Sequence, residues 1–69
     1  MVVQSIVNVI KSAKNDGKLG RLSMALLVIS ENFANDKYVL NLLLRKTDEV
    51  NDKGVKEQRE CIKHLLSNL

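Results

Sequence analysis

The sequence predicts an all-α protein whose four helices form two antiparallel helical hairpins. Apolar residues recur every three or four positions over most of the chain, the spacing that lines one face of a helix. The chain of 69 residues has room for one domain, residues 1–69, with hairpins expected over 2–34 and 36–69. Three dipeptides typical of turns interrupt the apolar pattern: Asn15-Asp16, Asn35-Asp36 and Asn51-Asp52.

The first helix is expected over residues 2–14. Val2 and Val9 widen its apolar stripe, which indicates burial on more than one side. Gly17, after Asn15-Asp16, is the usual signal that ends a helix. The stripe itself comprises Val3, Ile6, Val7, Ile10 and Ala13.

The second helix is expected from Leu19 to Phe33, and it is apolar nearly all round. Met24, Leu27 and Val28 extend its stripe, so the pattern predicts a central helix covered by its neighbours. Asn35-Asp36 breaks this helix and offers a cap for the next. Its stripe comprises Leu22, Ala25, Leu26, Ile29 and Phe33.

The third segment, residues 36–46, is apolar over most of its circumference, so a buried strand is the alternative. Leucine favours a helix, and no second strand is available for pairing, so we expect a helix.

Residues 47–54 are polar and indicate a loop, with Asn51 to Gly54 as its turn. In an alternative interpretation, Thr47 is the N-cap of an earlier start. The last helix is expected to reach the C-terminus, and Arg59 covers a gap in its apolar stripe. The stripe comprises Val55, Ile62, Leu65, Leu66 and Leu69.

The two halves of the chain resemble each other. Residues 6–11 and 40–45 are both aliphatic runs that end in a basic residue, and residues 25–30 align with 62–67 at the offset that separates Gly17 from Gly54. The closing stretch, 57–69, resembles the longer helices of armadillo and HEAT-type repeats, in which a Leu-Ser-Asn-Leu ending is common, although the armadillo Gly-Ala-Leu-Pro-like turn is absent. This resemblance implies a protein-binding scaffold built from two units.

A compact bundle without repeat history is the alternative architecture. Repeat units bury their faces on neighbours, and about three are typically needed for stability. Two units would leave an apolar flank open, which predicts self-association or a place in a longer array. Under either architecture, we expect the function to depend on the contacts that the surface of the protein makes.

The net charge of +3 arises entirely in the first part of the chain. Residues 31–69 carry seven acidic and seven basic side chains, whereas residues 1–30 carry four basic side chains against Asp16. We expect the four to meet at one corner of the first hairpin, as a partner- or anion-binding site or as a solvated corner: Lys11, Lys14, Lys18 and Arg21.

No residues form a pattern that predicts catalysis, a metal site or a cofactor. Cys61 is the only cysteine, and its partner His64 lacks a third orienting group. The acidic residues Asp48, Glu49 and Asp52 lack the spacing of a calcium loop, so solvation is the better interpretation. We therefore expect a non-enzymatic protein.

The expected function is protein–protein interaction or oligomerisation within a larger assembly, through a protein partner or a second copy. Phe33 and Tyr38 flank a turn and are candidate interface aromatics. In the alternative interpretation, Phe33 closes the core and Tyr38 lies at its edge. The alternative function is a small basic nucleic-acid-binding regulator of phage or viral type. No signal peptide or membrane span is evident, so we expect an intracellular protein, cytoplasmic or nuclear.

Overall fold

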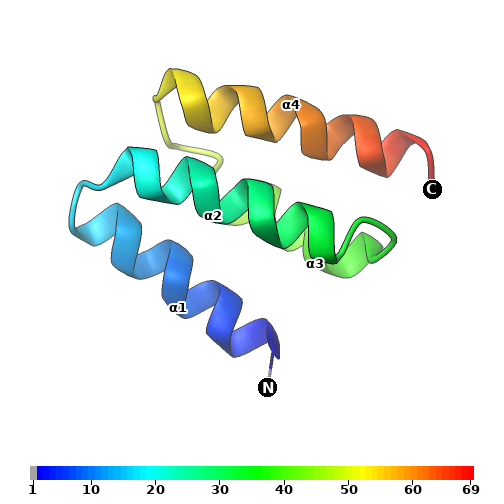
Figure 1. Ribbon diagram of the computed structural model, residues 1–69, viewed down its shortest axis with the longest axis horizontal. Coiled ribbons are helices and arrows are strands. Elements are labelled where there is room, and N and C mark those ends of the chain that lie inside the picture. The colour runs from blue at the N-terminus through cyan, green and yellow to red at the C-terminus, as the bar shows by residue number, and fades with distance from the viewer. Residues whose placement is uncertain (1) are drawn as a thin grey trace.

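The computed structural model describes residues 2–69, with side chains from Val3 onward. Over these residues the chain forms four helices and no strand, which confirms the predicted fold class (Figure 1). The third segment is a helix rather than the alternative strand. The helices are α1 (Val2–Asn15), α2 (Leu19–Asn32), α3 (Lys37–Lys46) and α4 (Lys53–Ser67).

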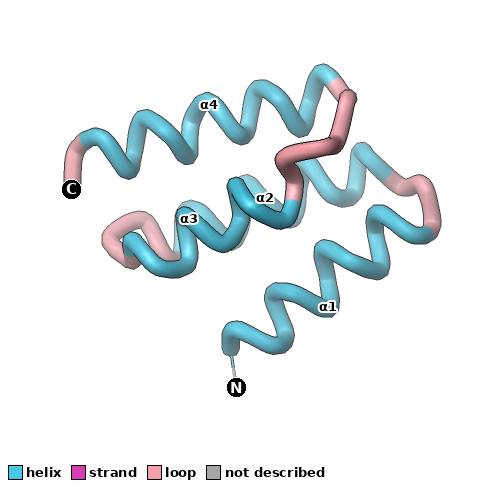
Figure 2. Tube along the Cα trace, turned by 180° about the vertical axis from the view of Figure 1, so that it is seen from behind, coloured by secondary structure: helices cyan, strands magenta, loops and turns pink. Residues whose placement is uncertain are grey.

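The helices pack as two hairpins, α1–α2 and α3–α4, around a central α2. Helices α1 and α4 lie on opposite sides of α2, and α2 and α4 run in the same direction (Figure 1). Seen from behind, α3 lies across the back of this arrangement, where it contacts the other three helices (Figure 2). The molecule is consequently flat, measuring 32 × 28 × 17 Å.

The core lies between α3 and the other three helices. Within α2, Leu22 and Leu26 are completely buried at its centre. The stripe predicted for α1 points inward, since Ile6, Ile10 and Ala13 are buried and Val3 and Val7 pack beside them. The other helices add Val39, Leu40, Leu42, Leu43, Val55 and Ile62.

Gly17 ends α1 as predicted, because it adopts a positive φ of 68°. The Lys18 N–H donates to the Ala13 carbonyl at 2.9 Å, and the Gly17 N–H donates to the Lys14 carbonyl at 3.1 Å. These two bonds form a Schellman motif, which uses carbonyls that the helix end would otherwise leave unpaired.

Aspartates cap the second hairpin at both of its helix starts. Asp36 accepts from the Val39 N–H at 3.1 Å, as expected for the cap of α3. Asp52 accepts from the Val55 N–H at 3.0 Å, so α4 begins at Lys53. The prediction that Lys53 and Gly54 belong to the turn is therefore wrong by two residues.

The alternative start of α4 at Thr47 is also wrong. The Thr47 hydroxyl donates to the Leu43 carbonyl at 2.7 Å, so this buried residue closes α3 instead. Gly54 lies in the first turn of α4, where a Cβ would stand 3.1 Å from Ser23 Oγ. Its missing side chain allows α4 to approach α2 closely at this point.

Arg59 joins α4 to the end of α3. Its guanidinium donates to the Leu44 carbonyl at 2.5 Å and to Thr47 Oγ1 at 2.8 Å, and it lies 3.4 Å from Asp48 Oδ1. Only 14% of the side chain is exposed. A cation at a helix C-terminus satisfies free carbonyls and complements the helix dipole. Arg59 thus acts as a clamp that joins α4 to the end of α3 through hydrogen bonds, in addition to covering the gap in the apolar stripe of α4.

Gly17 and Gly20 provide a matched pair of substitutions. Both have open space where a Cβ would stand, but only Gly17 has a positive φ. We expect Gly17→Ala to lower the free energy of unfolding by about 1 kcal/mol, because an L side chain is strained there. Gly20→Ala should instead raise it by up to about 1 kcal/mol through helix propensity. Urea denaturation measures the free energy of unfolding of both variants. Equal effects of the two substitutions would contradict the role of Gly17 as the residue that requires a positive φ.

Arg59→Met keeps the aliphatic stem and removes the donors. We expect a loss of about 1–3 kcal/mol in the free energy of unfolding, because buried carbonyl and hydroxyl oxygens lose a charged donor. Arg45→Met is the control, since Arg45 is exposed and makes no side-chain hydrogen bond or ion pair with any described residue. Urea midpoints at unchanged slope compare the two variants. Equal losses would show that Arg59 is not a clamp.

Candidate interaction surfaces

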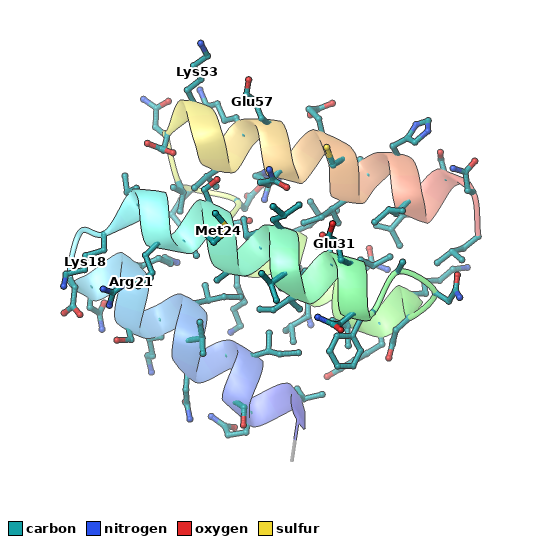
Figure 3. All side chains as sticks on the ribbon, in the orientation of Figure 1. Lys18, Arg21, Met24, Glu31, Lys53 and Glu57 are labelled. Carbon is teal, nitrogen blue, oxygen red and sulfur yellow. The ribbon has the colours of Figure 1, made fainter. Side chains whose placement is uncertain are left out.

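The four predicted basic residues divide between two sides of the first hairpin. Lys11 and Lys14 of α1 line a hollow of about 160 Å³ beside Lys46, at the C-terminal end of α3. Lys18 and Arg21 lie at the start of α2, on the side that Figure 3 turns toward the viewer. The corner predicted from sequence is therefore split between the α3 side and the opposite face.

Lys14 is engaged within the fold. Its ammonium donates to the Lys46 carbonyl at 2.9 Å and forms an ion pair with Glu49. The hydrogen bond from Lys14 is the main cause that lowers the pKa of Glu49 below its ordinary value of 4.5. In contrast, the side chains of Lys11, Lys18 and Arg21 make no hydrogen bond or ion pair with any described residue.

The predicted acidic cluster does not act as a unit. Glu49 pairs with Lys14, Asp48 lies near the Arg59 guanidinium, and Asp52 caps α4. Each carboxylate thus has a separate structural partner in another part of the chain or in the backbone. Sequence reasoning missed these partners because two of the three lie far away in the sequence.

The two aromatic residues lie at the turn between α2 and α3. Phe33 is half-buried and packs against the core, whereas Tyr38 is 60% exposed at the start of α3. Both residues line one shallow hollow formed by residues 31–38. The structure therefore brings them together, with Tyr38 as the accessible member.

A groove of about 480 Å³ runs between α2 and α4. Leu27 and Leu65 form its apolar floor, and the exposed Cys61 and His64 border it. The buried Oε1 of Gln58, also in the lining, accepts no hydrogen bond from the described residues. Cys61 is consequently an exposed residue at the border of this groove.

The most exposed apolar side chains of α2 lie opposite α3. Met24 is 59% exposed and Val28 is 48% exposed, on the helix face opposite the buried Leu22 and Leu26. Figure 3 shows Met24 at the middle of this face. Val9 of α1 is 46% exposed, so it does not widen the buried stripe as expected. The side chain of Val2 lies outside the described residues.

We name this surface the open face: Arg21, Met24, Val28 and Glu31 of α2. Val9 lies on the side of α1 away from Lys11, and Lys11 lines the hollow beside α3, so the exposed Val9 lies on the same broad side of the molecule. Sequence reasoning placed Met24 and Val28 in the interior because it assumed that an all-round apolar helix is covered all round. The charges of Arg21 and Glu31 are the signal that could have marked this side as exposed. The apolar flank expected for two repeat units stays a prediction, since Met24 and Val28 lie on the central helix.

The described residues bring together no group of three or more His, Cys, Asp or Glu side chains that could hold a metal ion. None of the four helices is both long enough and apolar enough to cross a membrane. Comparison with protein-family models, curated proteins and solved structures finds no match for this chain. Its function must therefore be inferred from its own surfaces.

Replacing Lys14 should remove the interaction that lowers the pKa of Glu49. In Lys14→Met we expect the Glu49 pKa to rise toward 4.5, because the carboxylate loses its hydrogen bond and ion pair. The pair stabilises the fold at pH values above the ordinary pKa of the carboxyl, and this contribution is lost as pH falls through the lowered pKa. A carbon-detected NMR titration of the carboxyl measures the shift. Lys11→Met is the control and should leave Glu49 unchanged, and an unchanged pKa in Lys14→Met would contradict the pairing.

Proposed function

We propose that this protein is a non-enzymatic protein-interaction or oligomerisation module, and that the open face of α2 is its contact surface. The observation that carries the proposal is the exposure of Met24 and Val28 on the helix at the centre of the fold. Large contiguous apolar patches on a surface mark sites of protein contact, and Met24 and Val28 are neighbours on one face of α2. We further propose that the protein acts inside the cell, in the cytoplasm or nucleus.

The arrangement of the hairpins gives this proposal a second line of support. Helices α2 and α4 are the second helices of their hairpins, and they pack side by side in the same direction (Figure 1). Stacked hairpins are the building principle of helical repeat proteins, which bind partners along extended surfaces. The resemblance to armadillo and HEAT-type repeats therefore remains our proposal for the origin of the two units.

A nucleic-acid-binding regulator is the second candidate. Lys11, Lys18 and Arg21 have no partner among the described residues, so they are free to contact phosphates. Lys14 is paired with Glu49, and the other three residues are divided between two sides of the hairpin (Figure 3), which reduces the charge that either side offers. We therefore rank phosphate binding below protein contact. Titration with random duplex at about 50 mM salt tests it, and an absence of binding rejects it.

Site-specific photocrosslinking tests the proposed function. With a photoreactive amino acid at position 24, in cells that naturally carry the gene, we expect discrete protein adducts, because the proposed partner covers Met24. Adding Val28→Lys to the same chain should remove them, because a charge disrupts an apolar contact. Denaturing gels and mass spectrometry detect the adducts.

The matched control carries the photoreactive residue at position 63. Lys63 is exposed on α4, and among the described residues its side chain bonds only Glu60, one helix turn away, at 3.1 Å. Adducts specific to position 24 and lost with Val28→Lys would support the open face as the contact surface. The same adducts at both positions, or none at position 24, would overturn it.

A further inference from the structure

The open face carries four residues at the spacing of a helix–helix seam. Arg21, Met24, Val28 and Glu31 follow one another at intervals of three, four and three positions. This alternation is the one by which two helices pack along each other in a coiled coil. All four side chains are exposed, and neither Arg21 nor Glu31 forms an ion pair with any described residue (Figure 3).

The order of these residues is self-complementary when it is reversed. The row reads basic, apolar, apolar, acidic along α2. If a second α2 lies antiparallel, with a twofold axis at position 26, Met24 faces Val28 of the other copy and Arg21 faces Glu31. Twofold symmetry produces each contact twice, as in an isologous dimer. The seam then has an apolar centre and an ion pair at each end.

The positions beside the seam obey the same symmetry. The twofold axis keeps each flank of the seam on its own side. Near position 26, Leu27 therefore lies close to Leu27 of the other copy, and Ala25 lies close to Ala25. Both residues are half-buried in the single chain, so the flanks add apolar area near the axis.

Charge order selects the antiparallel arrangement. A parallel pair in register would place Arg21 against Arg21 and Glu31 against Glu31, and like charges in these positions are destabilising. The antiparallel pair replaces both repulsions with attractions. The acidic and basic ends of one helix therefore specify a second copy of the same helix.

The broad side of the molecule that carries the open face is large enough for a dimer interface. Stable interfaces bury about 800 Å² on each partner. The broad side of this molecule measures 32 by 28 Å, so such an interface requires most of that side. Val9 on α1 and the groove between α2 and α4 extend the apolar area beyond the seam. With only Met24 and Val28 at its centre, we expect micromolar affinity.

We propose that the occupant of the open face is a second copy of this chain, bound as an antiparallel α2–α2 pair with its twofold axis at position 26. This inference rests on the proposed function and names the partner. It explains why a helix at the centre of a small fold carries apolar residues toward solvent. It also assigns a role to Arg21, whose side chain pairs with no described residue of the single chain.

Sedimentation equilibrium of charge-reversal variants tests the pairing. The unsubstituted chain should pass from monomer to dimer between about 5 and about 500 µM. Arg21→Glu and Glu31→Arg should each weaken the dimer by about 10-fold or more, because both ends of the seam then hold like charges. The double variant Arg21→Glu/Glu31→Arg should restore dimerisation, since the reversed charges again face each other.

Mixing the two single variants gives the sharpest outcome. Each alone should remain largely monomeric, but an equimolar mixture should form a heterodimer, because one chain presents only acids and the other only bases at the seam ends. Arg45→Glu is the control, since it changes charge equally on α3, away from the open face. Circular dichroism confirms that every variant is folded.

A chain that stays monomeric throughout this range overturns the inference, as does a dimer that the reversals at positions 21 and 31 leave unchanged. Neither outcome decides the proposed function. Crosslinks specific to position 24 that join a protein of another mass would keep the open face as a contact surface. A monomeric chain without crosslinks at position 24 would reject the open face as a contact surface.

Discussion

Helix α3 covers α2 from one side, and none of the other described helices covers it from the opposite side (Figure 1). A domain of this size has few residues with which to enclose a core. The fold places Leu22 and Leu26 between α3 and the outer helices, where they are completely buried. The opposite side of α2, with Met24 and Val28, is left toward solvent. The core and the proposed contact surface are therefore two sides of one helix.

Polar interactions fix how α3 is held against the other helices. Arg59 reaches from α4 to the last carbonyls of α3, and Lys14 reaches from α1 to the same end, where it contacts the Lys46 carbonyl and Glu49. Both cations lie at the negative end of the α3 dipole. Lys14 thus joins the first hairpin to the second, whereas Arg59 joins the two helices of the second hairpin to each other.

The local features of the fold could be predicted from sequence because local residues determine them. The inward stripe of α1, the turn at Gly17 and the cap at Asp36 each depend on a few neighbouring residues. The partners of Lys14 and Arg59 could not be predicted, since they join positions 35 and 11–15 residues apart. The exposure of Met24 was missed for a related reason. Periodicity locates an apolar face but does not determine which neighbours cover it.

The central claim is that the open face of α2 is a contact surface for a second copy, and amide NMR spectra recorded during dilution test it most directly. Each backbone amide reports whether its own surroundings change as the dimer dissociates. The account predicts concentration-dependent shifts centred on residues 20–32, with weaker shifts near Val9 and little change in α3. Spectra that do not depend on concentration, or shifts centred on α3, would contradict it.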